Sequence, residues 1–118
     1  MRNKILGLIG CALLMTACSG NSYKTITENE AMPLIQNNAV IIDVRTLDEY
    51  NTGHIKDAIN IPVDNISSIN YEKDTVIILY CASGMRSANA AKMLIDNGYT
   101  NVYNLDGGLI NWGAELEG

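Results

Sequence analysis

A cysteine and an arginine in the middle of the chain have the types and the spacing to do chemistry on an anion. Four uncharged residues separate them and a serine follows, so that the segment reads Cys81, Ala82, Ser83, Gly84, Met85, Arg86, Ser87. The thiolate is the nucleophilic form of cysteine, and a nearby positive charge lowers the thiol pKa from its usual value of about 8.5. Gly84 lets the backbone turn so that several N–H groups converge on one point. The segment therefore predicts a reactive thiol in an anion-binding loop.

The residues on either side of this loop predict how the thiol is positioned. Residues 75–80 form an apolar, β-branched run that is typical of a strand buried on both faces. After the loop, apolar residues recur at helical spacing up to Ile95, and Gly98 stands where a glycine ends a helix. A loop between a central strand and a helix lies in the crevice where open α/β sheets bind ligands, and the free N–H groups at a helix start favour an anion. A buried, inert cysteine is the alternative, and it leaves Arg86 without a role.

The first half of the chain predicts two capped helices around a strand. Thr27 with Glu30, and Thr46 with Glu49, form capping boxes. We expect helices from residue 27 to about residue 37 and from residue 46 to residue 53, with a strand at 40–44 between them. Pro33 lies inside the first helix and is expected to displace or bend its first turn.

The second half continues the alternation of strands and helices. Residues 54–61 read as a connector with a short extended piece, residues 63–70 as one short helix, and residues 101–105 as a strand. Gly107 and Gly108 lead into an expected final helix that contains Ile110, Trp112 and Leu116. Strands that alternate with helices predict an α/β fold with a central parallel sheet and helices on both faces.

These motifs resemble the rhodanese family of sulfurtransferases. The loop matches the family's active-site pattern C-x-x-G-x-R-S, and three further landmarks follow the family order: IDVR at 42–45, GHIKDAINIP at 53–62, and LDGG at 105–108 with Trp112 behind it. Together they span about residues 24–116. The resemblance implies a three-layer rhodanese-like fold and a sulfurtransferase that needs no cofactor.

The resemblance also implies a role for each loop residue. The Cys81 thiolate would take sulfane sulfur from a donor such as thiosulfate or a persulfide, hold it as a persulfide, and pass it to a thiol or to cyanide. The N–H groups of the loop, residues 82–85 with Ser87, would stabilise the charged sulfur. Arg86 would either orient an anionic donor or hold the loop by hydrogen bonds to its carbonyl groups. The uncharged loop residues argue against thiosulfate as the natural donor.

Residues outside the loop match the family in supporting positions. Asp43 and Arg45 correspond to its upstream D-x-R, where a buried ion pair or a support for the loop is favoured over contact with the substrate. His54 lies in the connector, where a structural role is favoured over that of a general base. Trp112 and the glycine pair at 107–108 are expected to serve packing and turns.

Other functions remain as alternatives. Phosphatases and arsenate reductases also use a cysteine and an arginine around an anion, but with five intervening residues, and the shorter loop here is cramped for a tetrahedral oxyanion. A non-catalytic sulfur carrier or binding module would use the same cysteine. A thiol redox partner would need a resolving cysteine for a stable internal cycle.

The first residues predict export and lipidation. Residues 1–17 have a basic start, a short apolar core and small residues before Cys18, as a secretory signal peptide does. The segment around Cys18 resembles a bacterial lipoprotein processing site, so we expect Cys18 to carry a lipid and residues 18–25 to form a tether for a domain at 26–118. The alternative is an ordinary signal peptide. The expected location is the bacterial cell envelope, facing the periplasm or the cell surface.

Composition limits the partners. The chain has 118 residues, 47% of them hydrophobic, which suits one small domain. The formal net charge of −5 disfavours a nucleic-acid partner. The sequence has a single histidine and no Cys/His cluster with zinc spacing, so no metal is expected. We expect small sulfur donors and thiol or cyanide acceptors, a membrane contact through the lipid, and a monomer.

Overall fold

The computed structural model describes residues 22–118. The expected signal peptide at 1–17, the lipidation of Cys18 and the first part of the tether lie outside the described residues. Among residues 22–118 there is no helix with the length and apolar character that a membrane span requires.

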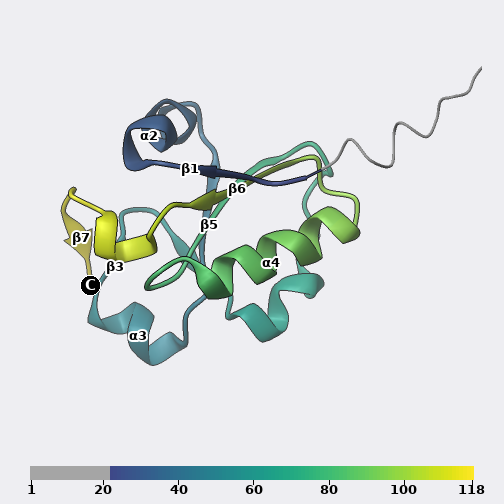
Figure 1. Cartoon of the computed structure of the whole chain (residues 1–118). Helices are drawn as coiled ribbons and strands as arrows, with labels where there is room; N and C mark the ends of the chain where they lie inside the picture. Colours follow the sequence, from purple (N-terminus) through teal and green to yellow (C-terminus); the bar gives the residue numbers. More distant parts are fainter. Residues whose placement is uncertain (1–21) are drawn as a thin grey trace, which may run out of the picture.

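A five-stranded sheet, parallel throughout, forms the centre of the molecule (Figure 1). Its strands lie in the order β1 (Lys24–Ile26), β6 (Asn101–Leu105), β5 (Val76–Tyr80), β2 (Val40–Asp43) and β4 (Ile59–Asn60). The α/β fold with a central parallel sheet is therefore confirmed. The strand that precedes Cys81 occupies the middle of the sheet, where neighbours on both sides pair with its backbone.

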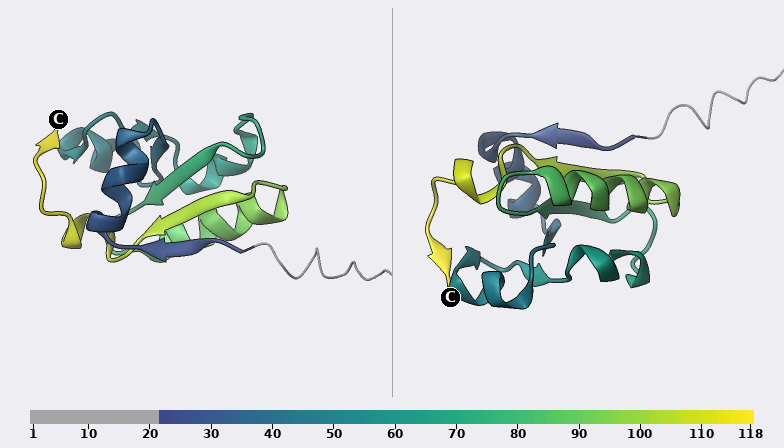
Figure 2. Two further views of the ribbon diagram at one scale, coloured as in Figure 1. Left: turned by 90° about the horizontal axis from the view of Figure 1, so that it is seen from above. Right: turned by 60° about the horizontal axis from the view of Figure 1, so that its bottom comes forward.

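The side chains of β5 alternate between two separate cores, as successive residues of a strand must. Ile77, Leu79 and Cys81 face the core beneath α4 (Met85–Asp96) and the 3₁₀ helix η1 (Val63–Ser68). Ile78 and Tyr80 face the core beneath α2 (Glu28–Gln36). The two views of Figure 2 show these layers on opposite sides of the sheet. Because both faces are covered, the strand is apolar throughout rather than alternating with polar residues.

The helix ends follow the expected capping residues. The threonine side chains of both predicted capping boxes accept the N–H of the glutamate three residues on, at the start of α2 and of α3 (Leu47–Thr52). α3 ends at Gly53, and Gly98 with φ +98° follows the end of α4. α3 follows β2 directly and so lies at the same edge of the sheet as the Cys81 loop, which we define as residues 81–86.

Several details differ from the expectations. The start of α2 is not displaced: the helix begins at Glu28 and carries Pro33 at its sixth position. The prediction of a final helix that includes Trp112 and Leu116 was wrong, because the 3₁₀ helix η2 ends at Asn111 (Gly108–Asn111). Leu116 instead lies in β7 (Leu116–Glu117), which pairs antiparallel with β3 (His54–Ile55). The sheet also begins earlier than expected, because β1 includes Lys24 and Thr25 of the segment we assigned to the tether.

Candidate active site

The Cys81 loop is continuous with the central strand β5, and backbone hydrogen bonds join it to η2. Cys81 directly follows β5 and is 1% exposed. Its carbonyl oxygen accepts the N–H of Leu109 at 3.0 Å, and the carbonyl oxygen of Ala82 accepts the N–H of Ile110 at 3.2 Å. A side chain at Gly108 would collide with the Cys81 carbonyl oxygen, and Gly108 has φ +56°. The glycine therefore permits the close approach that fixes the base of the loop.

The sulfur of Cys81 is surrounded by hydrogen-bond donors. Gly84 N–H donates to Sγ at 3.1 Å, Ser87 N–H reaches it at 3.5 Å, and Ser87 Oγ lies 3.4 Å away. Gly84 precedes the first residue of α4 in a left-handed conformation, with φ +107°. This conformation turns its N–H back toward the sulfur, which lies at the N-terminal end of a twelve-residue helix. The arrangement favours a negatively charged sulfur.

Two opposing effects determine the acidity of the thiol. Burial is the largest single influence and disfavours the thiolate, but hydrogen bonds from Ser87, through both its side chain and its backbone, and from the Gly84 and Ser83 amides together outweigh it. The pKa of Cys81 is therefore lowered. Since the thiolate is the nucleophile, this environment supports the predicted reactive thiol.

Ser87 also contacts a residue that the sequence did not single out. Its hydroxyl donates to Asn104 Oδ1 at 2.5 Å, and Asn104 Nδ2 lies 3.4 Å from the carbonyl oxygen of Gly84. Ser87 is fully buried and Asn104 is 6% exposed. A buried chain of polar groups thus runs from β6 to the sulfur.

Arg86 points to a carboxylate rather than to the loop carbonyls. Its Nη1 and Nη2 donate to the two oxygens of Glu49 on α3, at 2.8 and 3.0 Å. The hydrogen bonds from Arg86 and from the Thr46 backbone lower the pKa of Glu49 to about 2. The positive charge of the guanidinium is therefore paired with a carboxylate at neutral pH. Among the described residues, Arg86 makes none of the hydrogen bonds to loop carbonyl groups that one of its two expected roles requires.

Asp43 and Arg45 form the buried ion pair that was one of the two expectations for them. The closest contact, between Arg45 Nη2 and Asp43 Oδ2, is 2.6 Å, and both side chains are almost wholly buried. Arg45 also donates to the carbonyl oxygen of Gly53 at 2.7 Å, so it ties the end of β2 to the end of α3. This pair holds the helix that carries Glu49.

The remaining candidate residues are His54 and the uncharged residues of the Cys81 loop. His54 stacks on Tyr50 and approaches Glu117, with Nε2 3.7 Å from a carboxylate oxygen. These contacts fit the structural role that we favoured. Within the loop, Met85 is 77% exposed, Ser83 is exposed and Ala82 is half-buried. These three side chains add no charge to the surface of the Cys81 loop.

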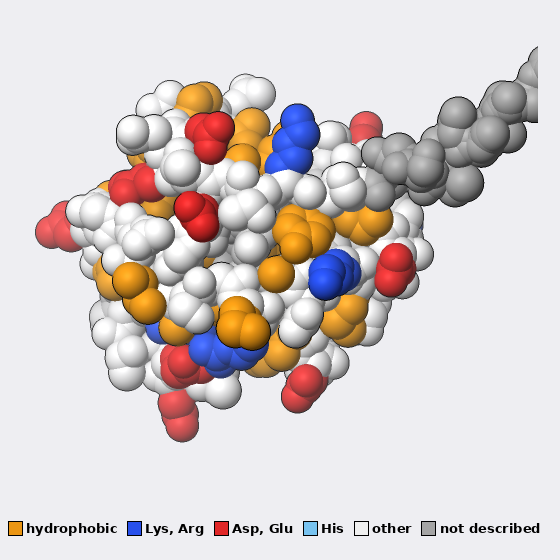
Figure 3. Space-filling view, in the orientation of Figure 1, with side chains coloured by type: hydrophobic (Ala, Val, Ile, Leu, Met, Phe, Trp, Pro, Cys, Tyr) orange, Lys and Arg blue, Asp and Glu red, His pale blue; other side chains and the backbone are white. Residues whose placement is uncertain are grey.

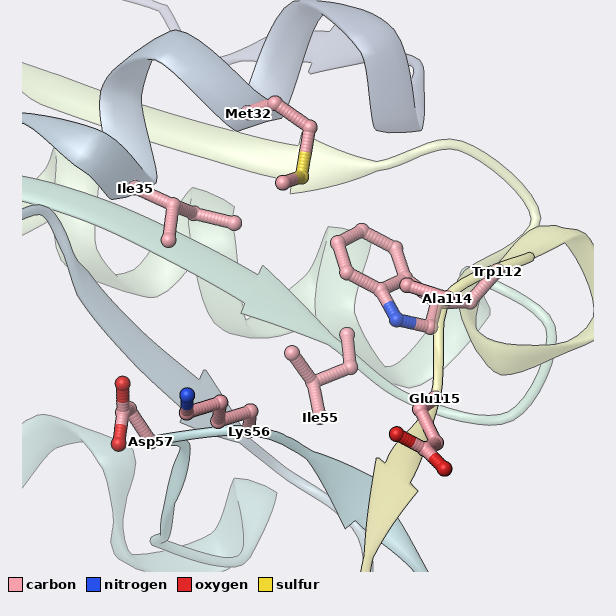
Figure 4. Close-up of a pocket in the computed structure, with 8 residues that line it drawn as sticks. All are labelled: Met32, Ile35, Ile55, Lys56, Asp57, Trp112, Ala114 and Glu115. Carbon is pink, nitrogen blue, oxygen red and sulfur yellow. The ribbon is translucent and has the colours of Figure 1, made fainter.

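An apolar pocket of about 240 Å³ lies away from the loop (Figure 4). We call it the Trp112 pocket; it is lined by Met32, Ile35, Ile55, Lys56, Asp57, Trp112, Ala114 and Glu115. None of these residues belongs to the Cys81 loop or contacts its sulfur through a hydrogen bond. The indole N–H of Trp112 is buried and has no hydrogen-bond partner among the described residues.

Charges are mixed on the face shown in Figure 3. Basic and acidic side chains of the described residues lie next to one another there, with hydrophobic side chains between them. This face shows no broad basic patch that would attract anions from a distance.

Sequence reasoning missed three residues of the site. Glu49 was identified only as a capping residue, although a glutamate in the helix after the D-x-R is well placed to reach the loop. Asn104 carried one usable signal, because a polar residue in a buried strand needs a partner. Gly108 was assigned to a turn, and the close approach that requires it depends on tertiary structure.

Comparisons with known proteins agree with this geometry. The rhodanese-like domain family matches residues 27–115. The protein YqhL of Bacillus subtilis is 36% identical over 99% of this chain and 98% of its own length. The thiosulfate sulfurtransferase GlpE of Shewanella oneidensis is 32% identical over 78% of this chain and 94% of its own. The crystal structure of a rhodanese-like domain protein from Staphylococcus aureus superposes with a TM-score of 0.71 at 36% identity, covering 80% of this chain and 96% of that one. The chain therefore belongs to the rhodanese-like family.

Proposed function

We propose that the protein is a sulfurtransferase that carries sulfane sulfur on Cys81. The thiolate attacks the outer sulfur of a donor, a new S–S bond forms at Cys81, and the donor leaves as sulfite or as a thiolate. An acceptor thiolate or cyanide then attacks the outer sulfur of the persulfide, and the Cys81 thiolate is released. Two easier steps replace one difficult step.

The observation that carries this proposal is the set of donors around one sulfur atom. The N–H groups of Gly84 and Ser87 both point to Sγ, and the Ser87 hydroxyl oxygen lies 3.4 Å from it. They favour the thiolate before the reaction and again when the persulfide is cleaved, because in both states charge develops on this sulfur. The name of the Shewanella relative, a thiosulfate sulfurtransferase, supports the same reaction class.

Two observations favour a persulfide over thiosulfate as the donor. Arg86, the cation of the loop, is paired with both oxygens of Glu49, and this carboxylate offsets the positive charge that would attract a dianion. Cys81 is 1% exposed, so a donor must deliver its terminal sulfur end-on through a narrow opening. The half-exposed apolar side chain of Leu47 and the strongly exposed Met85 and Ile110 come from the three elements around the loop and suit an uncharged donor.

The test follows both halves of the reaction on the purified chain. The protein is incubated with thiosulfate or with a small alkyl persulfide, and thiocyanate formation from cyanide is measured. In parallel, trypsin releases residues 74–86, which contain Cys81 as their only cysteine, and their mass shows whether one sulfur atom has been added. We expect the added sulfur, turnover, and a higher kcat/KM for the persulfide.

The other outcomes separate the alternatives. Added sulfur without turnover would replace the enzyme by a sulfur carrier that depends on a partner. If neither added sulfur nor turnover is seen with either donor, the proposal is overturned, and the phosphatase and binding functions become the leading alternatives.

We also propose that the domain is lipid-anchored in the cell envelope through Cys18. The proposal rests on the sequence pattern of the first residues. Cys18→Ala is expected to move the protein from the membrane fraction to the soluble fraction of the host without changing sulfur transfer. Unchanged fractionation would refute the anchor and leave the chemistry untouched.

A further inference from the structure

Two groups compete for the single hydroxyl proton of Ser87. Its Oγ lies 2.5 Å from Asn104 Oδ1 and 3.4 Å from Cys81 Sγ. A serine hydroxyl has only one proton to donate, and the much shorter of the two contacts assigns this proton to the hydrogen bond with Asn104. Sγ must then be the donor in its contact with Oγ. The orientation of the Ser87 hydroxyl therefore fits the protonated form of Cys81, while the N–H groups of Gly84 and Ser87 favour the thiolate.

The orientation of Asn104 maintains this competition. Its Nδ2 faces the carbonyl oxygen of Gly84 at 3.4 Å, so the other atom of the amide, Oδ1, faces Ser87. Ser87 is fully buried and Asn104 is 6% exposed, so the site offers little access for water to replace either partner. A buried acceptor that loses its donor is costly, which is why Asn104 holds the proton firmly.

We propose that Asn104 is a positioning residue that holds the Ser87 proton away from the Cys81 sulfur until that sulfur becomes negatively charged. When Cys81 ionises, its own proton leaves to solvent, and the Ser87 hydroxyl turns from Asn104 to Sγ. When the sulfur is neutral again, the hydroxyl returns to Asn104. As a statement about sulfur transfer this rests on the proposed function, but the proton arrangement itself concerns the free thiol.

The charged groups around Cys81 stay the same in the test. They are Arg86 from α4, its partner Glu49 from α3, and the buried pair of Asp43 and Arg45 at the end of β2. η2, which covers the base of the loop, contains no titratable side chain. Substitution of Asn104 changes none of these charges, so a change in thiol acidity reports on the Ser87 proton.

The test measures thiol acidity with no sulfur donor present. The rate at which iodoacetamide alkylates Cys81 is followed against pH, with the tryptic peptide 74–86 as the readout. Asn104→Leu keeps a similar volume and removes the competing acceptor. We expect the Cys81 pKa to fall by about one unit, so that the thiolate fraction on the acid side rises roughly tenfold. Asn101→Leu, at the other end of β6, is the matched control and should leave the pKa unchanged.

Ser87→Ala completes a double-mutant cycle. It should raise the Cys81 pKa, and in that background Asn104→Leu should have no further effect, because the contested proton is absent. Asn104→Ala is the second variant in case the leucine disturbs the fold, which far-UV circular dichroism would show. The proposal is overturned if neither Asn104 variant lowers the pKa, or if the shift persists without Ser87. A purely structural role would lower the melting temperature and leave the pKa unchanged.

Discussion

The Cys81 loop and the Trp112 pocket are opposite kinds of concavity. The loop has almost no free volume, since Cys81 is 1% exposed, yet several donors converge on its sulfur. The pocket has about 240 Å³ and a mostly apolar lining, yet its buried indole N–H has no hydrogen-bond partner among the described residues. The apolar pocket thus lies in a region that lacks a nucleophile, and the nucleophile lies where there is almost no free volume.

The difference follows from the size of what is bound. A small-molecule site usually needs a volume that encloses most of its ligand. A sulfur carrier needs to stabilise one additional atom and its charge, which a ring of N–H groups does at short range. Convergent donors, rather than volume, therefore mark the candidate active site. The five predictions below test this distinction.

Cys81→Ser should have the largest effect. The hydroxyl keeps the size and the hydrogen-bonding ability of the residue, so the fold should survive, but a serine at neutral pH is not a comparable nucleophile. Sulfur transfer to cyanide should fall to the level without enzyme. Near-wild-type turnover in this variant would show that the sulfur is carried elsewhere.

Gly108→Ala should displace the backbone of the Cys81 loop while leaving the Cys81 side chain chemically unchanged. The added methyl group would collide with the Cys81 carbonyl oxygen at a residue with φ +56°. We expect a loss of about 1–3 kcal/mol in the free energy of unfolding from the backbone conformation and at least a tenfold loss of kcat/KM. Chemical denaturation and steady-state kinetics check the two effects. Gly98→Ala is the control, since a side chain there meets only the flexible Lys73, and activity should survive.

Glu49→Gln should change the choice of donor. The amide oxygen can keep the helix cap, but Arg86 regains a free charge, so kcat/KM for thiosulfate should rise about fivefold, or by ~1 kcal/mol. Asp48→Asn removes the same charge from the exposed side of α3 and should leave the thiosulfate value unchanged.

The ion pair also predicts a pH dependence. The pKa of Glu49 is lowered to about 2, so its stabilisation is fully present above the unfolded value near 4.5 and is lost as the pH falls toward 2. Because both partners are more than a third exposed, the loss should be under about 1 kcal/mol. Urea unfolding at pH 5 and pH 2.5, compared between wild type and Glu49→Gln, measures it.

Trp112→Phe should have the smallest effect. It removes the unpartnered N–H, whose burial costs about 1–3 kcal/mol, and it also loses some apolar contact area. The two changes oppose each other, so the free energy of unfolding should stay within about 1 kcal/mol and kcat/KM within about twofold. A large loss of activity would mean that the Trp112 pocket takes part in the reaction after all.

Local signals predicted most of the fold. The capping boxes at Thr27 and Thr46 and the apolar run before Cys81 depend on residues close in sequence, and their elements appear where expected. The prediction of a final helix was wrong because Leu116 pairs with Ile55, which lies 61 residues earlier in the sequence. This distant pairing outweighs a short helical pattern. β1 was missed for the same reason, since three residues form a strand only beside β6.

The candidate site was predictable at Cys81 but not around it. The motif identified the thiol, the glycine turn and Ser87, because these lie within seven residues. The partner of Arg86 comes from 37 residues earlier and the partner of Ser87 from 17 residues later. No local pattern distinguishes Glu49 from an ordinary capping glutamate, or Asn104 from an ordinary polar residue in a strand.

The contact between η2 and the Cys81 loop has a consequence for the order in which the chain is made. The backbone groups that fix the base of the loop come from Leu109 and Ile110, and the strand that carries Asn104 is the last of the large sheet to be synthesised. β1, although made early, has no partner until β6 emerges. A growing chain therefore contains Cys81 and the N–H donors of its loop before β6 and η2 are present to fix them, so the site is completed only after Ile110 has been synthesised.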